Sequence, residues 1–233
     1  MLEIKNLRVS YGKKEVLKDI SLSFSSGKVH GILGVNGAGK TTLFKTIYGF
    51  KKANAGVRTF QNRPLKNQDI AFLETSNFFY PLMTGKEYLQ LLGFRSSDFS
   101  IDRWNQLFEL PLGEYVENYS TGMKKKLAFV GMMALDRPIL ILDEPFNGVD
   151  IESNEKILQI LMRLKQAGKI IIIASHIIES LTRICDRIDL LEQGVIKETF
   201  EQRDFPILEK QLKEKIQMKI DDVFDFSKKS ERT

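Results

Sequence analysis

A glycine-rich segment between an apolar stretch and a helical pattern constrains this chain more than any other feature. The segment matches the pattern G-x-x-x-x-G-K-[ST] and reads Gly34-Val35-Asn36-Gly37-Ala38-Gly39-Lys40-Thr41. Residues 29–33 before it read as a short strand, and Thr41 to Tyr48 after it read as a helix. Glycines permit the dihedral angles that turn several backbone N–H groups toward one anion. We therefore predict a phosphate-binding loop at the start of a helix, where the helix dipole also favours negative charge.

The residues of this loop predict a nucleotide site with its metal ion. Lys40 is expected to contact the β and γ phosphates, and the Thr41 hydroxyl is expected to bind Mg²⁺. The predicted cofactors are ATP and Mg²⁺. The predicted phosphate-binding residues are Gly34, Asn36, Gly37, Ala38, Gly39, Lys40, Thr41 and Thr42.

Two later apolar runs indicate the fold class. Residues 139–142 and 170–173 are continuous aliphatic stretches, which suit parallel strands buried on both faces. Helical patterns follow them, from Glu152 to Gln166 and from His176 to Cys185. Strands that alternate with helices imply right-handed crossovers and a doubly wound α/β core of the P-loop NTPase type.

The chain is expected to form a single domain with distinct parts. Residues 1–73 and 136–200 form the core, together with an antiparallel β sub-domain near the N-terminus, and residues 74–135 form an inserted helical sub-domain. Residues 201–233 form a C-terminal helix and tail. Apolar residues at four-residue spacing predict a helix from Pro206 to Ile220, and the charged stretch from Lys219 onward is expected to fray.

Two adjacent carboxylates follow the first aliphatic run directly. Asp143 and Glu144 are expected at the carboxyl end of a strand, where open parallel sheets bind their ligands. Neighbouring strand residues point to opposite sides, so one carboxylate can hold the metal while the other reaches water. We predict Asp143 as a Mg²⁺ ligand and Glu144 as the general base or water-positioning group.

Composition limits the other possibilities. The net charge is +5, but the run Lys124-Lys125-Lys126 reads as the solvated face of a helix, without interleaved aromatic residues. Nucleic-acid binding is therefore not expected. The single cysteine, Cys185, reads as a small core residue. No apolar stretch reaches the ~20 residues that span a bilayer, and no signal peptide is visible, so we expect a cytoplasmic protein.

The order and spacing of these motifs resemble ATP-binding cassette (ABC) ATPases, from Leu2 to about Phe200. The resemblance implies that Tyr11 stacks on adenine. It implies that Ser120, Thr121, Gly122 and Met123 form the signature, which binds the γ-phosphate of ATP held by a second subunit. Thr121 and Met123 depart from the usual S-G-G-Q, and this S-x-G-M form is similar to that of bacterial exporters.

Two further residues are assigned by the same resemblance. Asp150 matches the D-loop aspartate, which couples the two nucleotide sites, and it can also cap the following helix. His176 matches the switch histidine that contacts the γ-phosphate. The catalytic set is therefore expected to be Glu144, His176 and Lys40.

One family motif is absent. The family has a glutamine after the strand expected at residues 70–73, whereas this chain has Glu74 and Thr75, either of which can occupy that position. The aromatic segment Phe78-Phe79-Tyr80-Pro81-Leu82-Met83 follows. It reads equally well as a socket for a membrane subunit and as part of the helical core.

The resemblance implies an ATP-hydrolysing subunit that dimerises around two MgATP molecules, with itself or with a homologue. It implies a membrane-spanning partner on a separate chain, a peripheral location on the inner face of the cell membrane, and export as the direction. Three alternatives are a soluble ABC-type ATPase that acts on nucleic acid or the ribosome, a weakly hydrolysing regulatory cassette, and an unrelated P-loop kinase.

Overall fold

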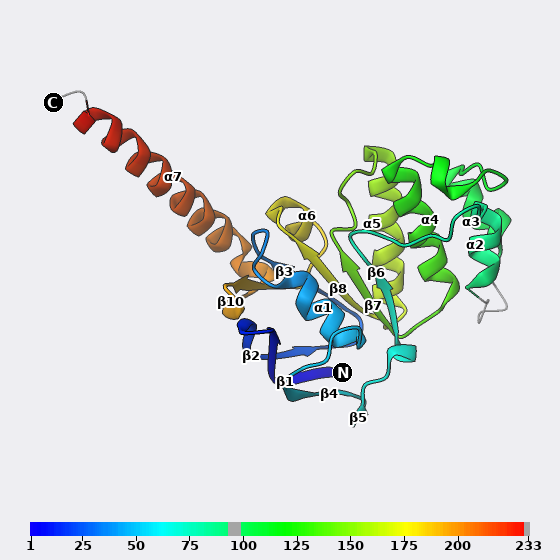
Figure 1. Ribbon diagram of the computed structural model, residues 1–233, viewed down its shortest axis with the longest axis horizontal. Coiled ribbons are helices and arrows are strands. Elements are labelled where there is room, and N and C mark those ends of the chain that lie inside the picture. Colours follow the sequence, from blue (N-terminus) through cyan, green and yellow to red (C-terminus); the bar gives the residue numbers. More distant parts are fainter. Residues whose placement is uncertain (93–98, 231–233) are drawn as a thin grey trace.

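Two sheets and seven α-helices make up the computed structural model, which describes residues 1–92 and 99–230 (Figure 1). The first sheet is antiparallel, in the order β2-β1-β4-β5, and contains β1 (Leu2–Tyr11), β2 (Lys14–Phe24), β4 (Ala55–Phe60) and β5 (Arg63–Pro64). The second has the order β10-β9-β3-β8-β7-β6 and contains β3 (Lys28–Leu33), β6 (Ile70–Leu73), β7 (Ile139–Asp143), β8 (Ile170–Ser175), β9 (Arg187–Glu192) and β10 (Val195–Glu201).

The helices are α1 (Lys40–Tyr48), α2 (Gly85–Leu91), α3 (Ile101–Phe108), α4 (Thr121–Ala134), α5 (Ile151–Gln166), α6 (Ile178–Thr182) and α7 (Phe205–Ser230). Three short 3₁₀ helices accompany them, at Asn67–Asp69, Val116–Asn118 and Gln202–Asp204.

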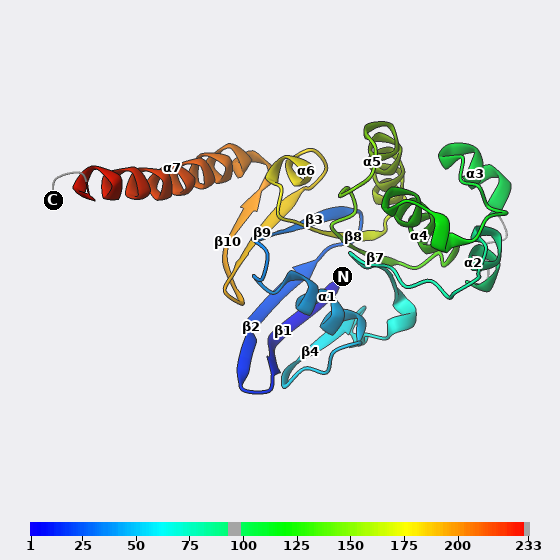
Figure 2. The ribbon, with the colours of Figure 1, turned by 45° about the horizontal axis from the view of Figure 1, so that its top comes forward.

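The second sheet is apolar on both faces, which is why its strands read as continuous aliphatic runs. In β7, residues 140 and 142 pack on the side of α4 and α5, whereas 139 and 141 face the first sheet. Helix α1 lies between the two sheets and buries Leu43, Phe44 and Ile47 there (Figures 1 and 2). The predicted α/β class is confirmed, and β3, β6, β7, β8 and β9 run parallel.

Two predicted helices differ from the structure. Helix α6 covers only Ile178–Thr182, because Ile177 is extended and its N–H donates to the Ser175 hydroxyl instead of a helical carbonyl. Helix α7 does not end near Ile220 but continues to Ser230. It leaves the body of the protein as a long arm (Figure 2), and within residues 205–224 only Phe205 and Leu208, in its first turns, are buried.

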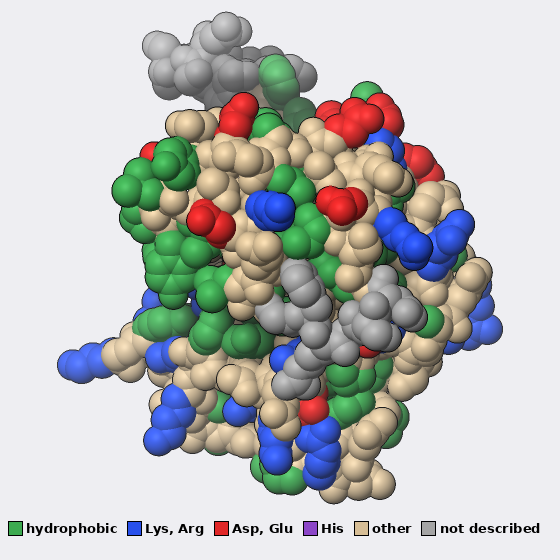
Figure 3. Space-filling view, turned by 90° about the vertical axis from the view of Figure 1, so that its right-hand side faces the viewer, with side chains coloured by type: hydrophobic (Ala, Val, Ile, Leu, Met, Phe, Trp, Pro, Cys, Tyr) green, Lys and Arg blue, Asp and Glu red, His purple; other side chains and the backbone are tan. Residues whose placement is uncertain are grey.

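Helices α2, α3 and α4 lie together beside the β6–β7 end of the second sheet (Figure 1). Figure 3 shows this face of the molecule, where hydrophobic side chains reach the surface among charged ones. Within residues 1–92 and 99–230, no helix has the length and apolar composition needed to cross a bilayer.

A buried histidine makes the stability of this fold sensitive to acid. His30, on β3, accepts a hydrogen bond from the Ser25 N–H at Nε2 (3.0 Å), and its Nδ1 has no hydrogen-bond partner among the described residues. Burial lowers the pKa of His30 from its ordinary 6.5 to about 4, and the positive charge of Arg187 adds to the effect. In the folded protein, His30 is therefore neutral at pH 7.

Because the pKa of His30 is lower in the folded state, the unfolded chain binds the extra proton first as the pH falls. The resulting stability is present above pH 6.5 and is lost progressively toward pH 4. We predict that lowering the pH from 7 to 5 costs the wild type about 2 kcal/mol more than His30→Gln. Urea denaturation at both pH values measures this difference. Equal losses in the two proteins would contradict the buried, neutral state of His30.

Candidate functional site

Four parallel strands end at one edge of the second sheet, and each is followed by a predicted functional residue. The phosphate-binding loop follows β3, His176 follows β8, Glu144 follows β7, and Thr75 lies just after β6. A cavity of about 270 Å³ opens at this edge. Its lining residues are Val16, Val35, Asn36, Gly37, Gly39, Lys40, Thr41, Thr42, Thr75, Asp143 and Glu144.

The loop depends on glycine where backbone angle or space excludes a side chain. Gly37 and Gly39 have φ values of 84° and 113°, in the region that residues with a Cβ rarely adopt. A Cβ on Gly34 would lie 2.6 Å from the Leu191 carbonyl oxygen. Gly34 and Ala38, both predicted as phosphate-binding, are not among the residues that line the cavity.

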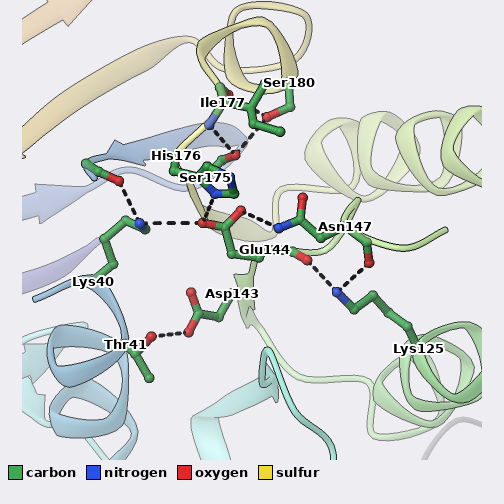
Figure 4. A network of polar contacts seen from close by, with 11 residues as sticks. Lys40, Thr41, Lys125, Asp143, Glu144, Asn147, Ser175, His176, Ile177 and Ser180 are labelled. Atoms are coloured by element: carbon green, nitrogen blue, oxygen red, sulfur yellow. Dashed lines mark hydrogen bonds and ion pairs between the residues drawn. The ribbon is translucent and has the colours of Figure 1, made fainter. Parts of the chain in front are cut away.

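Lys40 is buried in the site, and its ammonium group has partners there. The residue is only 6% exposed, and its Nζ donates to the Gly34 carbonyl oxygen at 2.6 Å (Figure 4). The same Nζ lies 3.5 Å from Glu144 Oε1. A buried ammonium requires such partners, and a phosphate oxygen in the cavity would supply a further charged one.

Thr41 and Asp143 form the predicted metal-binding pair. The Thr41 hydroxyl donates to Asp143 Oδ2 at 2.7 Å, and Asp143 Oδ1 is buried without a hydrogen-bond partner among residues 1–92 and 99–230. An unpartnered buried carboxylate oxygen beside a hydroxyl fits a hard cation such as Mg²⁺. No group of three or more His, Cys, Asp or Glu side chains in the described part of the chain could hold a metal alone. Phosphate oxygens or water would complete the ligand set.

Glu144 reaches the site through a turn and not through strand alternation. Strand β7 ends at Asp143, and Glu144 has a φ of 52°, so the two carboxylates diverge because the backbone turns there. Glu144 Oε1 lies 2.9 Å from His176 Nδ1, and Glu144 Oε2 accepts from Asn147 Nδ2 at 3.2 Å (Figure 4). The structure thus brings together Lys40, Glu144 and His176. Asn147 was not predicted as a site residue.

The expectation that the lysine run is a solvated helix face is wrong for Lys125. This residue is 4% exposed, and its Nζ donates to the main-chain oxygens of Glu144 (2.7 Å) and Asn147 (2.9 Å). Lys126 is also largely covered and pairs with Asp150 Oδ2 at 3.2 Å. These lysines are covered because α4 packs against the loop that follows β7, which leaves only part of the helix surface exposed to solvent.

The residues predicted to form the signature lie at the start of α4 and outside the cavity lining. Ser120 is the N-cap, and its hydroxyl accepts from the Met123 N–H at 3.2 Å, while Ser120 and Thr121 are exposed. Asp150 caps α5 by accepting from the Ser153 N–H at 2.8 Å. Hydrogen bonds from Ser153, and then the Lys126 ammonium, hold the pKa of Asp150 far below its usual range.

The residues predicted at the rim of the site differ in whether they line the cavity. Thr75 lines the cavity, whereas Glu74 turns away and lies 3.3 Å from Lys45 Nζ. Tyr11 is half-exposed and does not line the cavity, and Lys51 Nζ lies 4.1 Å from its ring centroid. Adenine stacking by Tyr11 therefore stays a prediction.

The aromatic segment after β6 lies mainly on the surface. Phe78, Tyr80 and Leu82 are 73%, 57% and 67% exposed, and Phe78 packs edge-on against Tyr80. Phe79 and Met83 are partly buried, and Phe79 packs against Tyr88. The core interpretation is wrong for Phe78, Tyr80 and Leu82, and the socket interpretation stays a prediction. Cys185, in contrast, is buried as expected, and burial raises the pKa of its thiol.

Comparison with known proteins adds an independent observation. The ABC transporter family profile matches residues 17–147. The ABC transporter ATP-binding protein YtrB of Bacillus subtilis (strain 168) is 32% identical over 203 residues, which are 83% of this chain and 70% of YtrB. The lantibiotic transport ATP-binding protein SrtF of Streptococcus pyogenes is 30% identical over 84% of this chain and 89% of SrtF.

A solved ATP-binding subunit of an ABC transporter superposes with a TM-score of 0.77, at 27% identity, over 88% of this chain and 91% of that one. Some relatives are much longer than the matched part. The match covers only 55% of an uncharacterized ABC transporter ATP-binding protein of Synechocystis sp. (strain ATCC 27184 / PCC 6803 / Kazusa), at 30% identity.

The buried position of Lys40 generates a prediction about nucleotide binding. Lys40→Ala removes a charge-assisted contact to phosphate worth ~1.5–3 kcal/mol, so ATP affinity should fall by about 10- to 100-fold. Titration with a fluorescent ATP analogue measures the affinity, and a melting curve checks that the variant is folded. Lys45→Ala serves as the control, because Lys45 lies in the last turn of the same helix and does not line the cavity. Unchanged affinity in Lys40→Ala would refute the assignment of the loop.

Proposed function

Because this chain belongs to the family of ABC transporter ATP-binding proteins, we propose that it hydrolyses ATP and thereby powers a transporter. The observation that carries the proposal is the contact of Glu144 with both Lys40 and His176, beside the Thr41–Asp143 pair. Hydrolysis of a phosphoanhydride needs positioned positive charge and a base for water, and these residues supply both.

In the proposed reaction, backbone N–H groups of residues 36–40 and the Lys40 ammonium hold the β and γ phosphates. Glu144 accepts a proton from the attacking water, and His176 and Asn147 fix the direction of its carboxylate. Thr41 and Asp143 would hold Mg²⁺, which would neutralise charge on the phosphates. The γ-phosphoryl group leaves as inorganic phosphate, and ADP remains.

The exposed signature supports a second subunit as part of each complete site. Ser120 and Thr121 are exposed and do not line the cavity of their own chain, and they lie at the start of a helix whose N–H groups suit an anion. In a head-to-tail dimer, these residues would bind the γ-phosphate of ATP held by the partner. Two MgATP molecules would then join two cassettes, which are either identical or homologous.

The surface segment at Phe78, Tyr80 and Leu82 supports a membrane-spanning partner on a separate chain. Contiguous exposed aromatic and aliphatic side chains of this kind mark interaction surfaces. This partner would keep the protein on the inner face of the membrane. Export is the proposed direction, supported by the S-x-G-M signature and by relatives such as the lantibiotic transport protein SrtF.

The assignment of Glu144 predicts a specific kinetic phenotype. Glu144→Gln keeps the shape of the side chain but cannot accept the proton, so kcat should fall by ~10²–10⁴-fold while ATP still binds. The variant should also accumulate as an ATP-bound dimer. Steady-state phosphate release and gel filtration with MgATP measure the two effects. Turnover of Glu144→Gln at the wild-type rate would remove Glu144 from this role, and a wild type that binds ATP without hydrolysing it would indicate a regulatory cassette.

The proposed membrane contact predicts a loss of partner binding. Phe78→Ser combined with Tyr80→Ser removes two aromatic anchors, each worth ~1–2 kcal/mol, so recovery of the partner should drop at least about tenfold. The tagged chain is purified from detergent-solubilised membranes, and the co-purifying polytopic membrane protein is quantified. Val57→Ser is the control, because Val57 is similarly exposed but lies on β4 of the first sheet. Full recovery of the membrane protein by the double variant would argue against this surface.

A further inference from the structure

We propose that Lys125 is a positioning residue for hydrolysis, because it holds the turn from which the Glu144 carboxylate projects. This inference rests on the proposed ATPase function and assigns a role to a residue outside the cavity. Lys125 does not line the cavity, and its ammonium donates to the main-chain oxygens of Glu144 and Asn147. It lies on α4, the helix that begins with the predicted signature.

The contact geometry shows why a lysine is suited to this place. One ammonium bridges the main-chain oxygens of Glu144 and Asn147, at 2.7 and 2.9 Å, and so closes both ends of the turn (Figure 4). The two side chains of the same turn are themselves joined, because Asn147 Nδ2 donates to Glu144 Oε2. Fixing the backbone at both residues therefore fixes the carboxylate.

This turn needs an external support. Glu144 has a φ of 52°, a left-handed conformation that is unfavourable for a residue with a Cβ. The turn's own closing hydrogen bond, from the Asn147 N–H to the Glu144 oxygen, is long at 3.4 Å. A buried, charged donor forms stronger hydrogen bonds to carbonyl oxygens than a neutral or solvated one.

The charge of Lys125 also suits its surroundings. Burial lowers the pKa of this ammonium, whereas the neighbouring negative charges of Glu144 and Asp143 raise it. The ammonium thus lies within electrostatic reach of both carboxylates without touching either carboxylate oxygen in the described structure. Its positive charge helps the buried site to keep two negative side chains side by side.

Two further contacts connect α4 with the loop that follows Glu144. A Cβ on Gly122 would lie 2.6 Å from the Gly148 oxygen, so the first turn of α4 packs directly on this backbone. Lys126 pairs with Asp150 at the loop's end. In the proposed dimer, the helix that contacts the partner's nucleotide would thus also hold the Glu144 of its own chain through Lys125.

The test compares Lys125→Met and Lys125→Gln with the wild type. Methionine has a similar length but no donor, whereas the glutamine amide can donate to one carbonyl and should have a smaller effect. We expect kcat to fall at least about tenfold in Lys125→Met, with KM for ATP within about twofold of the wild type. Single-turnover hydrolysis is measured below the melting temperature of each variant. Lys156→Met is the control, because Lys156 lies on the surface of α5 and pairs only with Glu152 among the described residues.

A double variant separates positioning from general destabilisation. If Lys125 acts through Glu144, adding Lys125→Met to Glu144→Gln should slow hydrolysis by less than about twofold more. A full additional tenfold loss, a wild-type kcat in Lys125→Met, or an effect of Lys125→Met confined to KM would overturn the proposal. A wild type without ATPase activity would instead refute the proposed function. If Glu144→Gln hydrolyses ATP slowly while Lys125→Met turns over at the wild-type rate, the role of Lys125 is refuted and the proposed function stands.

Discussion

Two buried ammonium groups on either side of Glu144 organise the edge of the sheet on which the proposed chemistry depends. Lys40 Nζ lies 3.5 Å from the Glu144 carboxylate, and Lys125 Nζ lies 2.7 Å from its main-chain oxygen. Burying a charge is unfavourable unless partners replace the lost water. Each lysine therefore ties one element to Glu144: Lys40 ties the phosphate-binding loop, and Lys125 ties α4.

The parallel sheet makes this arrangement possible. Because β8 is hydrogen-bonded to both β3 and β7, the segments that follow these three strands meet at one edge, although β3 precedes the other two by more than a hundred residues. Apolar packing on both faces fixes the strand register and leaves this edge as the polar region. The Thr41–Asp143 contact and the Glu144–His176 contact both depend on that register.

The loop from Glu144 to Asp150 joins the cavity to helix α4, at whose start the predicted signature lies. Its first residue faces the cavity, while its last caps α5 and pairs with Lys126 of the signature helix. Contacts between α4 and this loop thus link the exposed surface proposed for the second subunit with the carboxylate proposed for water activation.

The sequence by itself determined the phosphate-binding loop, the aliphatic strands and the pair Asp143–Glu144, because those features are local in the chain. It also indicated the signature at Ser120 and the histidine at 176 through resemblance. It did not reveal β9 and β10, which lack a continuous apolar run, or the full length of α7. Tertiary structure decided that Thr75 and not Glu74 faces the cavity, that Glu144 turns through a positive φ, and that Lys125 is buried. The physical reason is that a residue's burial and partners depend on elements distant in the chain, which local periodicity does not record.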